Sequence, residues 1–312
     1  MTQDLPGDVP AVKTKANIYQ IHYREEQVPF LDPDFMPYNN AGDDDPLLEF
    51  NVFRKIQRSS KLKKGQLWGA LSWKFTEKTG MTGAELFDFI ARHPGYDVYY
   101  CNPHPNFEGI YHNLWLQGET AHPDFLRLCR EVFRHTGLPV SSLTSLQPAR
   151  AFASTNYIIA TPIFWKSYIA FVESVLEITQ TRASNKILQL MHSNAADASG
   201  VHAGANYLPF IVERLFSVFL MSNEGRTLRP IKYPLPALEA KLNIHQRQLR
   251  EMKEVACAKR SAWMASCWVN YRNLYLAQQH GKVWLKKYLK PITPHNLEFI
   301  DFPSFTFESI TE

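Results

Sequence analysis

The sequence predicts an α/β protein with a largely parallel sheet flanked by helices and a long helical C-terminal extension. Short runs rich in β-branched and aromatic residues alternate with amphipathic segments over the first two thirds of the chain. The 312 residues are 45% hydrophobic and 13% aromatic, which is typical of a well-packed globular protein. No run of about 18 apolar residues is present, so no segment is expected to span a bilayer.

The first predicted strand covers residues 17–23 (NIYQIHY). Residues 24–45 are dense in Pro, Asp, Asn and Gly, and this composition predicts irregular structure. A helix is expected from Pro46 to Arg58. The run Asp43-Asp44-Asp45 could bind a cation, or Asp45 could cap this helix with Pro46 in the first turn, and the cap is the preferred interpretation.

Three further strands are predicted at residues 67–73 (LWGALSW), 96–101 (YDVYYC) and 155–160 (TNYIIA). Thr82 and Glu85 have the spacing of a capping box, which places a short helix between the first two of these strands. A helix opening with aromatic residues follows the last strand after Thr161-Pro162. The resulting strand–helix alternation favours a parallel sheet.

Polar, aromatic and cationic side chains follow three of the predicted strands. Ligands of parallel sheets gather at the carboxyl ends of the strands, so these side chains are candidates for binding a sugar or a nucleotide. Ordinary loop polarity is the alternative. The candidates are His22, Tyr23, Trp73, Lys74, Asn102 and His104.

The stretch 200–220 (GVHAGANYLPFIVERLFSVFL) passes from a loop of small residues into an apolar helix that carries Glu213 and Arg214 side by side. Buried charges are costly. The two residues therefore either form a core ion pair or face a cleft where substrate meets them. His202 lies in the preceding loop, which could act as a movable lid over a binding site.

Glu119 and His122 form an E-x-x-H pair, a pattern found in carboxylate-bridged metal proteins. Such sites need a second pair, which this sequence lacks, so Glu119 is interpreted as a helix-end or cleft residue and no protein metal site is predicted. The four cysteines show no CxxC spacing, which suits a reducing compartment and predicts a cytoplasmic protein.

The C-terminal part of the chain is strongly basic. Residues 225–290 hold fourteen Lys or Arg and three Glu, a net charge of +11, whereas the whole chain carries +4. This asymmetry indicates an anionic partner, or simply a solvated long helix. Four aromatic residues lie among these cations: Trp263, Trp268, Trp284 and Tyr288. This mixture suits a helix that lies at the inner membrane face, that packs on the first domain, or that binds a second copy of the chain. No nucleic-acid motif is recognisable, so nucleic acid is not an expected partner.

The order of segments resembles bacterial GT-A glycosyltransferases of capsule and O-antigen synthesis. The matching segments, within residues 17–220, are NIYQIHY, LWGALSWKF, YDVYYCNP, HNLWLQGETAHPDF, NYIIATPIFWKSYIAF and PFIVERLFSVFL. The resemblance implies a GT-A-like (Rossmann-like) catalytic domain at 17–224, after a leader at 1–16 and before the extension at 225–312.

The resemblance also implies a hexosyltransferase that moves a sugar from a nucleotide-sugar donor to a polysaccharide or lipid-linked acceptor. Glu213 is then the candidate base, Arg214 or Lys74 could offset the leaving diphosphate, and Asp97 could contact the nucleotide or serve the sheet. GT-A enzymes usually carry Asp-x-Asp where this chain has 101–104 (CNPH). A Mn or Mg cofactor therefore stays open, as does the alternative of a non-catalytic binding or scaffold protein.

Overall fold

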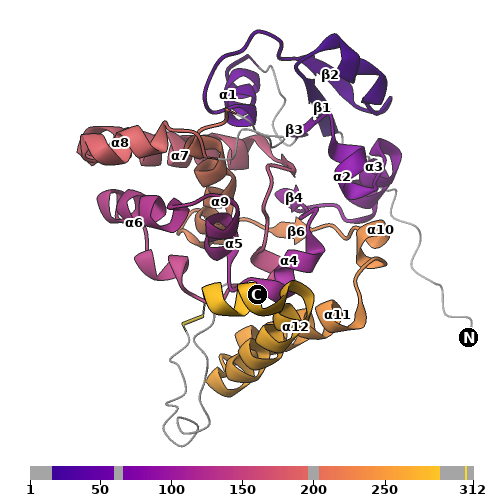
Figure 1. The fold of residues 1–312 in the computed structure, drawn as a ribbon. Helices are drawn as coiled ribbons and strands as arrows, with labels where there is room; N and C mark the ends of the chain where they lie inside the picture. The colour runs from indigo at the N-terminus through magenta and orange to yellow at the C-terminus, as the bar shows by residue number, and fades with distance from the viewer. Residues whose placement is uncertain (1–15, 60–65, 196–203, 289–305, 308–312) are drawn as a thin grey trace, which may run out of the picture.

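The computed structural model describes residues 16–59, 66–195, 204–288 and 306–307. Six strands form one mixed sheet in the order β2-β1-β3-β5-β4-β6 (Figure 1). The strands are β1 (Ala16–His22), β2 (Met36–Asn39), β3 (Leu67–Ser72), β4 (Val98–Tyr100), β5 (Ile158–Ala160) and β6 (Pro230–Lys232). The predicted α/β class is confirmed.

The sheet is mixed, which corrects the expectation of a mostly parallel one. β1 pairs in parallel with β2 and β3, and β4 pairs in parallel with β6, but β5 runs antiparallel to both β3 and β4. After β4 the chain folds through several helices and re-enters the sheet from the edge at which β4 ends. It must therefore run back in the opposite direction. Gly69 of β3 allows this pairing, because a Cβ there would overlap the carbonyl oxygen of Ile158.

β2 was not predicted and lies inside the stretch expected to be irregular. Its residues are mostly exposed and include Pro37, so their side chains carry no strand pattern. The strand exists because its backbone pairs with β1, for example Tyr19 opposite Met36. At the other edge β6 pairs with β4, so the sheet continues past residue 224, where the catalytic domain was expected to end.

Helices cover both faces of the sheet, because alternate strand residues point to opposite sides. Trp68, Ile158 and Ala160 face the larger core with α1 (Glu49–Ser59), α5 (Leu114–Ala121), α6 (Phe125–Thr136), α7 (Pro162–Arg182), α8 (Asn185–Met191) and α9 (Tyr207–Met221). Leu67, Leu71 and Ile159 face the smaller core with α2 (Phe75–Thr79), α3 (Gly83–Arg92) and α10 (Pro236–Glu239). The predicted capping box of Thr82 and Glu85 starts α3. Among the described helices, none combines the length and apolar character needed to cross a bilayer.

The start of α1 shows how the acidic run is used. The helix begins at Glu49, three residues later than predicted, and Asp45 Oδ1 accepts the Leu47 N–H at 2.9 Å. Asp43 forms an ion pair with Lys55 at 3.0 Å, and the hydrogen bonds it accepts hold the pKa of its carboxyl below the usual value although partial burial opposes them. Asp43 and Asp45 of this acidic run are thus held at the start of α1 by an ion pair and a hydrogen bond.

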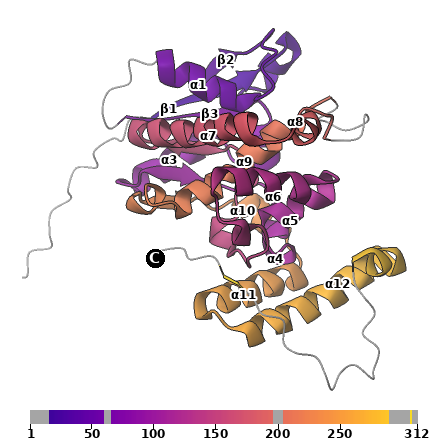
Figure 2. The ribbon, with the colours of Figure 1, turned by 90° about the vertical axis from the view of Figure 1, so that its left-hand side faces the viewer.

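α11 (Ile244–Lys259) and α12 (Ala262–Tyr288) pack together as the C-terminal layer, set against the short helix α4 (Pro105–Ile110), as Figure 2 shows. The last carbonyls of α4 accept hydrogen bonds from this layer. Lys253 Nζ donates to the carbonyl oxygen of Glu108 at 2.8 Å, Trp268 Nε1 donates to Gly109 at 2.7 Å, and Arg272 donates to Ile110. Cations at a helix C-terminus also complement its dipole, so this layer is firmly docked.

Candidate functional site

A cavity of about 140 Å³ lies at the carboxyl ends of β3 and β4 and is called here the Glu213 cavity. Five parts of the chain converge on it: the start of α1, the end of β3 with α2, the loop after β4, the approach to β5, and α9. The reversed direction of β5 is what brings its amino end to this edge. Its polar lining consists of Glu49, Ser72, Lys78, His104, residues 154–157 and Glu213.

Glu213 lies in the second turn of α9 (Tyr207–Met221), whose first turn is capped by Asn206 accepting the Leu208 N–H at 3.0 Å. The carboxylate is half-buried and forms no hydrogen bond or ion pair with any residue that the structure describes. Burial raises the pKa of Glu213 to about 7, opposed by Arg214 and Lys78 and reinforced by Glu49. At neutral pH this group is therefore poised to take up or release a proton.

A second carboxyl and one cation share the cavity with Glu213. Burial raises the pKa of Glu49, and Lys78 opposes that shift. Lys78, from α2, is half-buried and is the cation that acts on both carboxyl groups. Neither residue stood out in the sequence, because Glu49 resembles an ordinary first-turn acid and Lys78 an ordinary solvent-facing lysine.

His104 forms the wall after β4 and is the residue preceding α4. Burial, together with the positive charge of Lys78, lowers the pKa of His104 to about 4, so the imidazole is neutral at physiological pH. Asn102 fixes this wall, since its Nδ2 donates to the His104 carbonyl oxygen at 3.0 Å and its Oδ1 accepts from Ser154 Oγ at 2.8 Å. The sequence prediction that Asn102 and His104 belong together at a strand end agrees with these contacts.

Two buried polar atoms at the approach to β5 have no partner. Thr155 Oγ1 and Asn156 Oδ1 belong to side chains 9% and 8% exposed, and neither forms a hydrogen bond in the described structure. Their residues line the Glu213 cavity. Buried polar groups are normally satisfied, so unpaired ones beside a cavity indicate hydrogen-bonding capacity kept for a ligand. The neighbouring Tyr157 hydroxyl, in contrast, bonds Ser72 Oγ at 3.0 Å.

Comparison with protein-family models, with curated proteins and with solved structures finds no match to this chain.

Arg214 does not line the cavity. Its guanidinium is 3% exposed and donates to the carbonyl oxygens of Leu114 (3.0 Å) and Phe210 (2.7 Å) and to Gln117 Oε1 (2.6 Å). It also lies 4.9 Å from the centre of the Phe125 ring. These contacts assign Arg214 to joining α9 with α5, which corrects the expectation that it meets a leaving group. The two charges seen side by side in the sequence thus point to different surroundings.

Two further predicted residues serve the fold. Asp97 precedes β4, at the end of the strand opposite the cavity, and its Oδ2 accepts the Arg229 N–H at 2.9 Å. This placement corrects the proposed nucleotide contact and matches the alternative that Asp97 serves the sheet. Glu119 Oε2 accepts the Leu126 N–H at 2.7 Å, where α6 follows α5, as expected for a helix-end residue.

The remaining candidates lie near the same sheet edge without lining the cavity. His22 is 5% exposed, and its Nδ1 has no partner among the described residues. Burial, together with Glu49 and Asp43, raises the pKa of Tyr23. Lys74 Nζ lies 4.8 Å from the centre of the Trp73 ring, so the two side chains form a cation–π contact. His202 falls outside the described residues.

The described residues contain no group of three or more His, Cys, Asp or Glu side chains that could hold a metal ion. At the Glu213 cavity the two carboxyl groups have raised pKa values, which favour protons over a cation, and Lys78 supplies positive charge beside them. This donor set does not fit the divalent ion that the GT-A resemblance leaves open.

Proposed function

We propose that this chain is a glycosyltransferase in which Glu213 removes the proton from the acceptor hydroxyl. One observation carries the proposal: the carboxyl group of Glu213 borders a cavity at the carboxyl ends of β3 and β4 and has a pKa raised to about 7. An unpaired, partly buried acid is costly for the fold, and such groups concentrate at functional sites. The fold would then be GT-A-like.

The reaction follows from the groups present. The acceptor oxygen attacks the anomeric carbon of the donor sugar, the bond from that carbon to the diphosphate oxygen breaks, and the acceptor proton moves to Glu213. The leaving diphosphate gains negative charge, which Lys78 can offset. Lys78 thus takes the role that the sequence suggested for Arg214 or Lys74. Because Glu213 acts as a base and not as a nucleophile, the proposed transfer inverts the anomeric centre.

The size and polarity of the cavity limit what it encloses. At about 140 Å³ it is smaller than the roughly 300–1,000 Å³ of most ligand pockets, so it suits the transferred sugar and not the whole donor. Thr155 Oγ1 and Asn156 Oδ1 are available to sugar hydroxyls. His104, neutral at physiological pH, adds a donor or acceptor without adding charge.

The proposed acceptor is a polysaccharide or a lipid-linked glycan. The C-terminal layer supports a position at a membrane surface, since its sequence is basic and Ile244 and Leu274 are 76% and 65% exposed. A cytoplasmic location at the inner membrane face is part of the same proposal.

The test combines donor binding with turnover. Melting temperatures are measured with UDP, GDP, CMP and dTDP sugars, with and without manganese, and nucleotide release is then followed for the donor that stabilises the protein. We expect Glu213→Gln to keep the donor-induced rise in melting temperature and to lose about 10²–10⁴-fold in turnover. Glu224→Gln, which alters an exposed carboxylate outside the cavity, is the matched control.

Full turnover by Glu213→Gln, or the absence of stabilisation by every donor, would overturn the enzyme assignment. Donor binding without turnover in the wild type would instead favour the binding or scaffold alternative.

A further inference from the structure

A second and larger cavity, about 510 Å³, lies between α11 and the carboxyl ends of β4 and β6, and is called here the α11 cavity. Its lining combines Asn102, the end of β6 with the following residues 233–235, residues 149–150, Glu108 and one face of α11. It shares no lining residue with the Glu213 cavity. Its volume is within the range of roughly 300–1,000 Å³ that holds small ligands.

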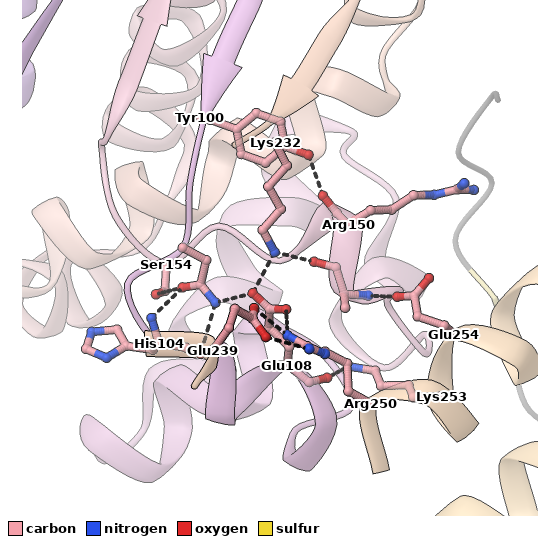
Figure 3. Close-up of polar contacts among 12 residues, drawn as sticks. Tyr100, His104, Glu108, Arg150, Ser154, Lys232, Glu239, Arg250, Lys253 and Glu254 are labelled. Atoms are coloured by element: carbon pink, nitrogen blue, oxygen red, sulfur yellow. Dashed lines mark hydrogen bonds and ion pairs between the residues drawn. The ribbon is translucent and has the colours of Figure 1, made fainter. Parts of the chain in front are cut away.

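The base of the α11 cavity is a network of charged side chains around the buried Glu108 (Figure 3). Glu108 is 3% exposed, and its Oε1 accepts from Lys232 Nζ at 2.5 Å and from Asn102 Nδ2 at 2.8 Å. Arg250 approaches the other carboxylate oxygen at 3.7 Å and forms a two-pronged pair with Glu239, both contacts at 2.6 Å. A paired, hydrogen-bonded network of this kind keeps each side chain in one position.

Fixed donors and acceptors are suited to a ligand rich in hydroxyl groups. A hydroxyl both donates and accepts, so it can bond to carboxylate and guanidinium groups in the same wall. Little side-chain entropy is lost on binding when the partners are already held in place. Pro234 and Leu235 add an apolar lining that suits the C–H faces of sugar rings.

The charge of the α11 cavity is balanced. Its described lining holds four cationic and four acidic side chains: Arg150, Lys232, Arg247 and Arg250, with Glu108, Glu239, Glu251 and Glu254. An anionic ligand such as a phosphate would find no excess of positive charge here, unlike a phosphate-binding site. The balance favours an uncharged ligand.

Asn102 joins the two cavities. It lines the α11 cavity, and its amide group bonds to His104 and Ser154, which line the Glu213 cavity. Ser154, His104 and Glu108 all form hydrogen bonds with this one amide. The two cavities are therefore neighbours, linked through the buried side chain of Asn102.

We propose that the α11 cavity binds an uncharged carbohydrate chain. Resting on the proposed function, this chain is the acceptor, held by α11 so that its terminal hydroxyl reaches Glu213. The C-terminal layer then has a substrate-binding role besides any contact with a membrane.

The test uses the full chain on an array of neutral and acidic oligosaccharides. The probing variant is Arg247→Ala combined with Glu251→Ala, since both side chains are exposed in the cavity wall and their loss should leave folding intact. Arg250→Gln, checked by its melting temperature, tests the pair of Arg250 with Glu239. The exposed Glu177→Ala outside both cavities is the control.

We expect the wild type to bind neutral glycans and the cavity variants to bind them about tenfold or more weakly, the loss of at least one hydrogen bond. The control Glu177→Ala should bind the glycan as the wild type does. Binding confined to acidic glycans, binding unchanged in the cavity variants, or no binding to any glycan would each overturn the inference.

The same variants separate this inference from the proposed function. Donor hydrolysis that depends on Glu213, without glycan binding, would support the proposed transferase function and refute the proposed acceptor site. Glycan binding that depends on the α11 cavity, with no turnover of any donor, would support the glycan-binding site and refute the proposed transferase function.

Discussion

Replacing Glu213 by Gln should stabilise the fold at alkaline pH while it abolishes the proposed activity. Gln has nearly the shape of Glu and cannot ionise, so the substitution removes the cost of a charge in the cavity wall. The described residues offer the carboxylate no ion pair or hydrogen bond that the change would break. Stability and function are therefore expected to move in opposite directions at this position.

The size of the effect follows from the pKa. The folded state keeps the Glu213 proton up to about pH 7, whereas the ordinary value is 4.5. Between these values the unfolded chain binds fewer protons than the folded one, so the wild type loses stability as pH rises. Each pKa unit corresponds to about 1.4 kcal/mol, which makes the full cost about 3 kcal/mol above pH 7 and close to zero below pH 4.5.

Urea unfolding at about pH 5 and about pH 8 measures this cost. Glu213→Gln should exceed the wild type in unfolding free energy by about 3 kcal/mol at the higher pH and by less than about 1 kcal/mol at the lower one. The exposed control Glu224→Gln should differ from the wild type by no more than about 0.5 kcal/mol at either pH. A difference for Glu213→Gln that does not grow with pH would refute the raised pKa and, with it, the assignment of the base.

Three more predictions concern the cavity and the C-terminal layer. Glu49→Gln removes a carboxylate that raises the pKa of Glu213, so the acid limb of the pH profile of kcat/KM should move to lower pH. Lys78→Met removes a cation that lowers this pKa, so the same limb should move to higher pH. If the limb stays in place in both, another group titrates. Lys253→Met removes the donor to the carbonyl oxygens of Glu108 and Tyr111 and should cost about 2–4 kcal/mol in urea unfolding. A loss below about 0.5 kcal/mol would show that this contact does not hold the C-terminal layer in place. Ile244→Ser with Leu274→Ser should reduce sedimentation with anionic lipid vesicles, and unchanged sedimentation would argue against the membrane-surface position.

Much of the fold could be predicted from local patterns. β1 contains β-branched and aromatic residues, β3 is a mainly apolar run, and both are largely buried. The capping box at Thr82 depends on residues three apart. β2 escaped prediction because an exposed edge strand carries no apolar alternation, and its formation depends on the backbone of β1. The direction of β5 escaped for a similar reason: side-chain alternation is the same whichever way a strand runs.

The residues of the candidate site also differ in whether the local sequence carries a signal for them. Glu213 could be found because a charge in an apolar helix is costly and conspicuous, and Asn102 with His104 because they follow a strand. Arg214 was conspicuous for the same reason as Glu213, yet one residue along a helix turns a side chain by about 100°, enough to point it into the core. Glu49 and Lys78 gave no local signal, since their importance depends on contacts between distant segments.

The reversed strand is the feature that ties the fold to the chemistry. In an all-parallel sheet this edge would gather only the residues that follow strands. Here β5 enters from the same edge, so Thr155 and Asn156, which precede it, are placed in the cavity wall. Both residues lie before the first residue of β5, and Thr155 Oγ1 and Asn156 Oδ1 are buried without a hydrogen-bond partner among the described residues. The mixed sheet, which was not foreseen, therefore supplies the polar groups that a sugar would bind, while the foreseen helix α9 supplies the acid.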